Sequence, residues 1–534
     1  LFEIREIIVH QHNGLFLHLL DNLINKVQVF GLHFASLDIR QDSSIHDLAI
    51  EAIVEKDDIL PKNYAELSEA EKISLLTTIG KKANIELHEG LAKDTLQSID
   101  VIRTIQEYNG PHGCNRYIIS HSSNALNIME VYGLFLLSGW QKHDLPIDIV
   151  PLFETIEDLK NAAQVMRSVY ENETYYRHLL QRNKVQTIMV GFSDGTKDGG
   201  YLMANWSIYK AKEELTAVSK EYGINVVFFD GRGGPPARGG GKTHKFYASM
   251  GHTISTKEIQ LTIQGQTVSS NFGTVDSAQF NIEQLLNAGI SNDLFIEDEK
   301  RLSEEQEVAI EELAIISFES YKGLKEHPHF LNYLSEISPL RFYSETNISS
   351  RPSKRGGSSR LTLNDLRAIP FVGAWSQLKQ NVPGYYGLGT ALQTIEKTGK
   401  LEAMKRIYQR SPYFRTLIDN CEMAMKKNFF PLTSYLSDHP QYGEIWNMIY
   451  EEYELTQKYL LKLSGQNELM SNYPVEQSSI QMREKIVLPL TTIQQYALTK
   501  MREEKKPDPK EKENLERLVV RSSFGIINAG RNSV

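Results

Sequence analysis

The chain has 534 residues, of which 41% are hydrophobic and 23% charged, a composition typical of a globular protein with a large apolar core. Its net charge of -9 excludes a general nucleic-acid-binding surface, which needs broad basic faces. No apolar stretch approaches the roughly 18 to 20 residues that cross a bilayer, and two cysteines cannot build a disulfide framework. We therefore expect a cytoplasmic protein that binds neither nucleic acid nor membrane. The start at Leu1, without a signal peptide or an initiator methionine, predicts that the chain begins within a longer protein.

Six short apolar runs rich in β-branched or aromatic residues predict strands. In chain order they are 31–37, 117–120, 147–153, 185–191, 224–229 and 258–264. Helical patterns follow most of them, as in 124–137, 156–170 and 201–221. Strands that alternate with helices in this way are typical of a parallel sheet or barrel.

Charged residues come directly after the predicted strands, namely Asp38, Arg40, Glu154, Asp194, Lys197, Arg232 and Arg238. In a (β/α)8 barrel the carboxyl ends of the strands carry the active site, so these residues would converge. An open doubly wound sheet would also gather them, but the chain has no GxGxxG between a strand and a helix. We therefore predict a TIM-like α/β barrel, incomplete at its N-terminal strand because only six strands are visible.

Beyond about Leu388 the strand signals nearly vanish and helical patterns dominate, as in 401–410, 413–427 and 442–463. We expect residues 1–387 to contain the barrel strands, their helices and the active-site loops. Residues 388–534 would form a large all-helical region, so that the chain is dominated by helices overall.

Two segments place carboxylates at neighbouring strand ends. In IMVGFSDGTKDGG (188–200), a glycine turn would expose Asp194 and Lys197 before a helix begins. These could be a metal ligand and a phosphate-binding cation, or a capped helix start with a surface ion pair. In VPLFETIEDL (150–159), helix capping explains Thr155 and Asp158 but leaves Glu154 unexplained. Two such carboxylates indicate a site for a hard cation.

The segment FDGRGGPPARGGGKTH (229–244) has six glycines and two arginines between Gly231 and Gly241. Glycines let the backbone approach a ligand closely, and guanidinium groups suit a small anion. A flexible linker is the alternative, but linkers favour serine over paired arginines and seldom follow a buried strand directly. The pattern therefore favours anion binding.

These motifs resemble those of the phosphoenolpyruvate carboxylase family. IMVGFSDGTKDGG resembles its second signature and DGRGGPPARGGG its mobile glycine loop, and other matches follow in family order: LDIRQDS, VPLFETIEDL, SRPSKRGG, LRAIPFVGAWSQ, SIQMRE and GRNSV. Asp230 stands where the family usually has histidine, and Phe192 and Gly195 replace a tyrosine and a serine. The first signature, similar to TAHPTE, is absent. The resemblance thus implies the C-terminal portion of such an enzyme, inactive alone.

The resemblance implies carboxylation of phosphoenolpyruvate by bicarbonate to oxaloacetate and phosphate, with Mg2+ or Mn2+ as cofactor. It also implies a homotetramer for the full-length protein, with L-aspartate and L-malate as inhibitors. The metal ligands would be Glu154 and Asp194. The anion-binding residues would be Arg40, Arg232, Arg351 and Arg367, with Lys197 close by and Asp230 in the place of the histidine. Leu152 and Met189 would line an apolar pocket for carbon dioxide, and Arg238 would close the site. Inhibitor contacts would come from Arg238, Lys427, Arg483 and Asn532.

Two alternatives remain from the sequence. The chain could be a non-catalytic module that binds anions or dicarboxylates for regulation or assembly, which the missing first signature favours. It could also be another barrel that uses phosphoenolpyruvate, such as a kinase or phosphotransferase, although nucleotide-binding motifs are absent.

Overall fold

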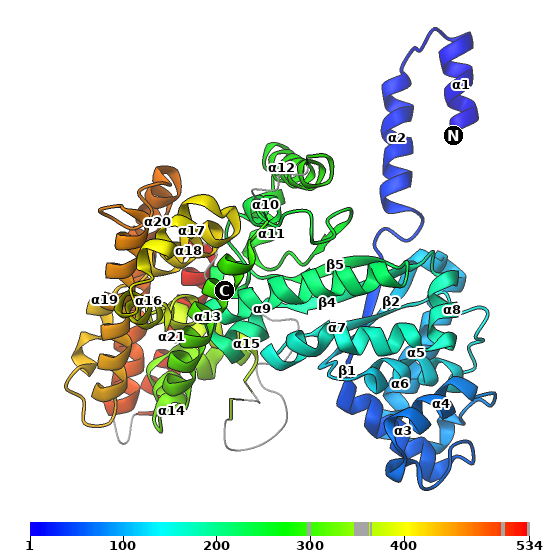
Figure 1. Ribbon diagram of the computed structural model, residues 1–534, viewed down its shortest axis with the longest axis horizontal. Coiled ribbons are helices and arrows are strands. Elements are labelled where there is room, and N and C mark those ends of the chain that lie inside the picture. Colours follow the sequence, from blue (N-terminus) through cyan, green and yellow to red (C-terminus); the bar gives the residue numbers. More distant parts are fainter. Residues whose placement is uncertain (296–300, 346–361, 364–365, 504–507, 531–534) are drawn as a thin grey trace. The chain divides into compact units, whose positions relative to one another are not determined.

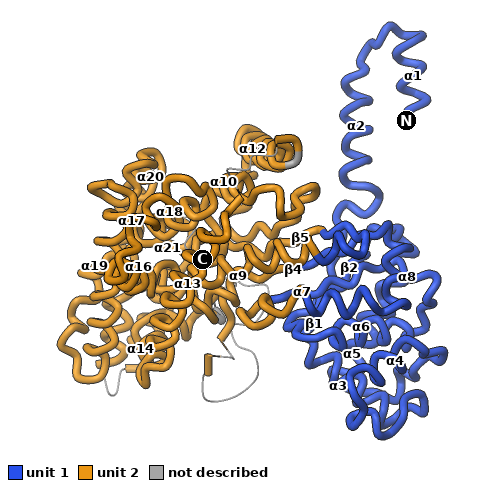
Figure 2. Tube along the Cα trace, in the orientation of Figure 1, with its two compact units in different colours: residues 1–153, 164–189, 218–226 blue, residues 154–163, 190–217, 227–534 orange. Residues whose placement is uncertain are grey.

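The computed structural model describes residues 1–295, 301–345, 362–363, 366–503 and 508–530 (Figure 1). The predicted site residues Arg351 and Asn532 lie outside these ranges. The chain divides into two compact units (Figure 2). Unit 1 comprises residues 1–153, 164–189 and 218–226, and unit 2 comprises residues 154–163, 190–217 and 227–534.

Unit 1 contains the first strands of the sheet and the helices that follow them. Strands β1 (Leu37–Asp42), β2 (Cys114–Ser120) and β3 (Asp148–Phe153) pair in parallel. Parallel strands covered on both faces read as continuous apolar runs, as the YIIS end of β2 does. The other elements up to β4 are α1 (Phe2–Gln11), α2 (Leu17–Phe30), α3 (Ser43–Lys56), α4 (Glu69–Thr78), α5 (Gly90–Asn109), α6 (Ala125–Leu137), α7 (Ile156–Glu171), α8 (Glu173–Gln181) and β4 (Val185–Gly191). Of these, α7 and β4 are each divided between the two units.

The first strand was predicted too early, at 31–37. In the structure α2 ends at Phe30 and β1 begins at Leu37. The apolar residues between them do not form a strand, because Phe34 adopts a left-handed backbone with φ of 62° and Leu32 is 94% exposed. Asp38 and Arg40 therefore lie within β1, where charged residues hide the strand from a hydrophobic pattern.

Unit 2 holds the last part of the sheet and the helical remainder of the described chain. Strands β5 (Asn225–Gly231) and β6 (Ile259–Leu261) pair in parallel, with Phe229 opposite Gln260. The elements that follow β4 are α9 (Phe192–Glu221), α10 (Thr243–Ala248), α11 (Gln266–Phe272), α12 (Val275–Leu294), α13 (Glu304–Lys325), α14 (Phe330–Ile337), α15 (Ala368–Gln377), α16 (Leu388–Lys397), α17 (Leu401–Arg410), α18 (Pro412–Lys426), α19 (Gly443–Ser464), α20 (Pro474–Glu503) and α21 (Pro509–Gly530).

The six strands follow one another in the sheet in chain order, β1 to β6, and the sheet is a curled parallel half-barrel. This arrangement and the dominance of helices confirm the coarse fold prediction. A buried core of unit 2 contains Trp375 of α15, whose ring lies against those of Phe330 and Tyr333 of α14. Trp446 of α19 belongs to the same core. Among the described residues, no helix combines the length and apolar character needed to span a membrane.

Candidate active site

The two candidate metal ligands follow consecutive strands, but the local structure around Asp194 differs from the prediction. Helix α9 begins at Phe192, so Asp194 and Lys197 lie in its first turns instead of in a loop. Gly200 interrupts this helix with φ of 76° and ψ of 173°. A left-handed residue ends a regular helix and favours glycine, so the predicted helix 201–221 is the second part of α9. The sequence showed only this second part because the glycine-rich first turns lack an apolar stripe.

Glu154 is 4% exposed and packs against the glycines on either side of Asp194. A Cβ atom at Gly191 would lie 3.2 Å from Glu154 Cγ, and one at Gly195 would lie 3.2 Å from the Glu154 carbonyl oxygen. Glycine at both positions thus brings the 192–194 turn against Glu154. Within the described residues, no group of three or more histidine, cysteine or acidic side chains is poised to hold a metal. Two carboxylates fit Mg2+ or Mn2+ when water and substrate oxygens complete the coordination.

Arg238 lies beside Asp194. Its Nε donates a hydrogen bond to Ser193 Oγ at 3.0 Å, and its Nη2 donates to Gln264 Oε1. Burial lowers the pKa of Arg238 to about 10, and the negative charge of Asp194 opposes this effect. The guanidinium group is therefore charged at neutral pH and held next to a candidate metal ligand.

The glycine loop that carries Arg238 is closed on itself. The Gly233 amide donates to the Arg238 carbonyl at 2.7 Å, and the Gly240 amide donates to the Pro235 carbonyl at 2.8 Å. A Cβ atom at Gly240 would lie only 1.8 Å from the Gly234 carbonyl oxygen, so only glycine fits there. Gly240 thus permits close backbone packing in the loop that holds the buried Arg238.

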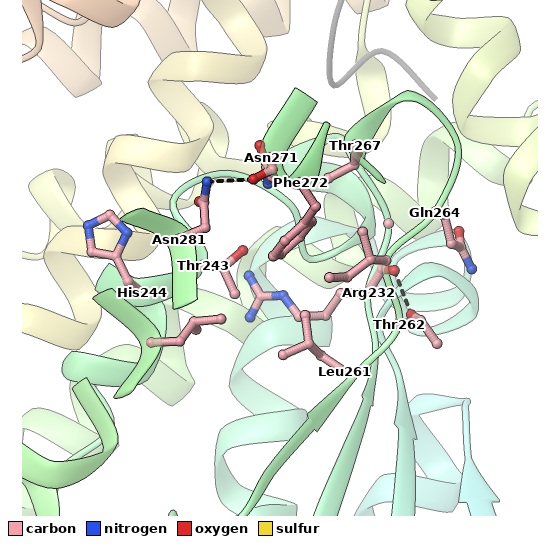
Figure 3. Close-up of a pocket in the computed structure, with 13 residues that line it drawn as sticks. Arg232, Thr243, His244, Leu261, Thr262, Gln264, Thr267, Asn271, Phe272 and Asn281 are labelled. Carbon is pink, nitrogen blue, oxygen red and sulfur yellow. Dashed lines mark hydrogen bonds between the residues drawn. The ribbon is translucent and has the colours of Figure 1, made fainter. Parts of the chain in front are cut away.

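Arg232 directly follows β5 and is 3% exposed. Its guanidinium carbon lies 4.2 Å from the ring centre of Phe246 and 5.2 Å from that of Phe192. Within the described structure, its Nη1 atom has no hydrogen-bond partner. Figure 3 shows this side chain among residues that line a small cavity of about 30 Å³, including Thr243, Leu261, Thr267 and Asn281. A buried guanidinium group facing a cavity is suited to bind an anion.

Asp230 does not line that cavity but points into the protein. It is fully buried and forms an ion pair with Lys212, with 2.6 Å between Nζ and Oδ1. Tyr247 donates a hydrogen bond to its other carboxylate oxygen. The residue in the place of the family's histidine thus belongs to a buried polar cluster.

Lys197 forms hydrogen bonds with the backbone just before Arg367. The Lys197 ammonium group donates to the carbonyls of Leu363 at 3.2 Å and Leu366 at 2.8 Å. Arg367 comes next in the chain and is the N-cap residue of α15. Lys197 therefore contacts the segment that immediately precedes Arg367.

The other predicted substrate residues lie in unit 1, each on a strand. In β1, Arg40 Nη2 donates a hydrogen bond to Asp38 Oδ2 at 3.2 Å. Leu152 is a partly buried residue of β3, and Met189 is a buried residue of β4.

The structure brings Lys427 and Arg483 together in unit 2. Both line a cavity of about 420 Å³, whose wall also includes glycines of the loop, such as Gly233 and Gly240. Arg483 donates to the Ala529 carbonyl at 3.1 Å, which links α20 to the end of α21. Arg238 does not line this cavity and lies with Ser193 instead. The cavity therefore gathers two of the four predicted inhibitor contacts.

Sequence reasoning missed Lys212 and Tyr247, the partners of Asp230. One signal for Lys212 was available, because it lies three or four residues from Ile208 and Leu215 on the buried face of α9. A lysine on an apolar face needs a buried counter-charge. Tyr247 gave no comparable signal, because tyrosine is common in cores.

Comparisons of the sequence relate the chain to known proteins. The family model described as phosphoenolpyruvate carboxylase matches residues 4–533. The phosphoenolpyruvate carboxylases of Nostoc sp. and Trichormus variabilis are each 33% identical to the chain, covering 93% of it and 53% of their own length. That of Thermosynechococcus vestitus is 34% identical over 93% of the chain and 51% of its own length. The chain spans about half the length of these curated relatives. Because the family model covers nearly the whole chain, the chain belongs to the phosphoenolpyruvate carboxylase family.

Proposed function

We propose that this chain supplies the metal-binding carboxylates and most of the anion-binding residues for carboxylation of phosphoenolpyruvate by bicarbonate. The observation that carries the proposal is the packing of the 192–194 turn against Glu154, with Arg238 beside Asp194. Family membership supports the reaction class, that of a carboxylating lyase. The products would be oxaloacetate and phosphate.

In the first step, a bicarbonate oxygen attacks the phosphorus atom and the bond from phosphorus to the enol oxygen breaks. Carboxyphosphate and the enolate of pyruvate result. Negative charge spreads over the phosphoryl oxygens in the transition state, and fixed guanidinium groups stabilise it. Arg232 and Arg238 are candidates because both are buried and pre-positioned, so they need little reorganisation. When bound to Glu154 and Asp194, Mg2+ or Mn2+ supplies positive charge to substrate oxygens.

In the second step, carboxyphosphate releases carbon dioxide and phosphate, and the enolate carbon forms a bond to carbon dioxide. Carbon dioxide is apolar and escapes readily into water, so retention requires a dry pocket. We assign Leu152 and Met189 to that pocket on the basis of the family resemblance. Arg367 and Arg40 would orient the substrate carboxylate and bicarbonate, with Lys197 holding the segment before Arg367.

We also propose that L-aspartate and L-malate inhibit the full-length protein from the 420 Å³ cavity. Lys427 and Arg483 provide two cations for a dicarboxylate, and the cavity shares its wall with the glycine loop. A ligand there would act on the same loop that carries Arg238, which couples the two sites. The homotetramer and the cytoplasmic location, with oxaloacetate feeding the tricarboxylic acid cycle, follow from the same resemblance.

The cationic cavity also supports a second candidate, a module that binds dicarboxylates without turnover. Turnover assays should be run on the chain alone and on the chain mixed with the remaining half of a relative. Activity only in the mixture, abolished by Glu154→Gln, would support the enzyme. No activity in either sample, together with saturable L-aspartate binding, would support the binding module.

A further inference from the structure

A buried polar cluster behind Arg232 joins three elements of unit 2. Asp230 lies in β5, Lys212 in α9 and Tyr247 in α10. Lys212 Nζ is 2.6 Å from Asp230 Oδ1 and 2.9 Å from Oδ2, and the two side chains are 1% and 0% exposed. Both carboxylate oxygens therefore face Lys212, and no substrate reaches them in this arrangement.

Tyr247 connects this ion pair to Arg232. Its hydroxyl donates to Asp230 Oδ2, and the guanidinium carbon of Arg232 lies 5.7 Å from the centre of its ring. Burial, reinforced by the charge of Asp230, raises the pKa of Tyr247 well above its usual value, so the phenol keeps its proton. A hydroxyl group has a single proton. Because Asp230 takes that proton, the phenol oxygen can act toward the neighbouring Arg232 only as an acceptor.

Charge balance makes Asp230 essential to this arrangement. Lys212 and Arg232 both lie within 6 Å of the ring centres of Phe246 and Tyr247. Two cations that share the same aromatic rings repel each other unless an anion lies near them. Asp230 supplies that anion and neutralises one of the two cations, so the cluster keeps one net positive charge. Because Asp230 pairs with Lys212, that charge lies on Arg232.

We propose that Tyr247 is a positioning residue for Arg232, and that the Lys212–Asp230 ion pair fixes the direction of the Tyr247 hydroxyl. The proposal rests on the proposed function, in which Arg232 binds a substrate anion. Asp230 then holds the anion-binding arginine through Tyr247 and does not transfer a proton in place of the usual histidine.

The first test is Tyr247→Phe, which deletes only the hydroxyl group. The matched control is Tyr333→Phe, because that hydroxyl is also buried and binds Gln380 at 3.1 Å, away from Arg232. Phosphoenolpyruvate binding with Mg2+ is measured by calorimetry. We expect about tenfold weaker binding for Tyr247→Phe, the effect of one hydrogen bond to a charged group. Tyr333→Phe should bind like the wild type.

A double-mutant cycle separates positioning from general destabilisation. In an Arg232→Met background, Tyr247→Phe should cause no further loss of affinity, because its effect passes through Arg232.

A second pair of variants tests the ion pair. Lys212→Met should lower the melting temperature, because it leaves a buried carboxylate unpaired. Adding Asp230→Asn should restore the melting temperature but not the affinity. Additive losses in the cycle, or full affinity in the Lys212→Met/Asp230→Asn protein, would overturn the proposal.

If the wild-type chain binds no phosphoenolpyruvate, the proposed function is refuted. The positioning role of Tyr247 is then tested by the chemical reactivity of Arg232. Phenylglyoxal modifies exposed guanidinium groups, and mass spectrometry measures its rate at Arg232. The positioning role predicts faster modification in Tyr247→Phe than in Tyr333→Phe. Equal rates in the two proteins would show that Tyr247 does not hold Arg232.

Discussion

The Lys197 ammonium group donates a hydrogen bond to the Leu366 carbonyl oxygen, with 2.8 Å between the two atoms. It also donates to the Leu363 carbonyl at 3.2 Å, so one side chain ties the start of α9 to the segment before Arg367. We expect Lys197→Met to lower the free energy of unfolding by about 1.5–3 kcal/mol, since charged hydrogen bonds are lost. It should also weaken phosphoenolpyruvate binding. Urea titration and calorimetry measure the two effects. Lys405→Met, which breaks an ion pair at the surface of α17, should change neither.

Mg2+ or Mn2+ binding should depend on Glu154 and Asp194. We expect Glu154→Gln and Asp194→Asn each to weaken the metal affinity at least about tenfold, because an amide is a poorer ligand for a hard cation than a carboxylate. Calorimetry with phosphoenolpyruvate present measures this affinity. Glu157→Gln is the control, because its carboxylate instead accepts from Asn161 within α7. Unchanged affinity in both ligand variants would refute the assignment.

Gly240→Ala should destabilise the protein, because its Cβ would meet the Gly234 carbonyl oxygen at 1.8 Å. Backbone atoms cannot move aside as a flexible side chain can, so we expect a loss of about 1–3 kcal/mol or more. Gly323→Ala in α13 provides the contrast, because no atom beyond its chain neighbours and the backbone of its own helix lies within 4 Å of the added Cβ. That variant should gain about 0.5–1 kcal/mol from helix propensity. Chemical denaturation of both variants gives the comparison.

Glu422 should make stability depend on pH. Burial raises the pKa of this carboxyl group to about 7, although the Met470 amide donates to it. The folded protein therefore holds a proton that the unfolded chain releases near pH 4.5. The stabilisation is complete below that value and is lost as the pH rises through about 7. Glu422→Gln should remove this dependence and be more stable than the wild type at pH 8. Parallel slopes of melting temperature against pH in the two proteins would contradict this prediction.

L-Aspartate should stabilise the chain through the 420 Å³ cavity. We expect a saturable rise in melting temperature that is lost in Lys427→Ala and Arg483→Ala, because each removes a cation from the cavity wall. Lys426→Ala is a close control, since the neighbouring lysine pairs with Glu468 and does not line the cavity. The same rise in all four proteins would place the ligand elsewhere.

Much of the secondary structure follows from local pattern. The strand predicted at 185–191 and the helix predicted at 401–410 have the observed bounds, because β-branched runs and 3.6-residue periodicity are properties of a short segment. The sequence also singles out Glu154 as a candidate ligand, because helix capping accounts for its neighbours but not for it. The first strand was misplaced because its charged residues mask its pattern.

Only the tertiary structure decided what the site residues touch. Asp230 finds Lys212 and Tyr247, which lie 18 and 17 residues away on two different helices. No local sequence pattern predicts these contacts, because they depend on the packing of α9 and α10 against β5. The same holds for Arg238, whose flanking glycines suggest an open loop although the backbone closes tightly around it. The sequence thus determined most of the strands and helices and the family motifs, whereas long-range packing determined which charged residues are buried together.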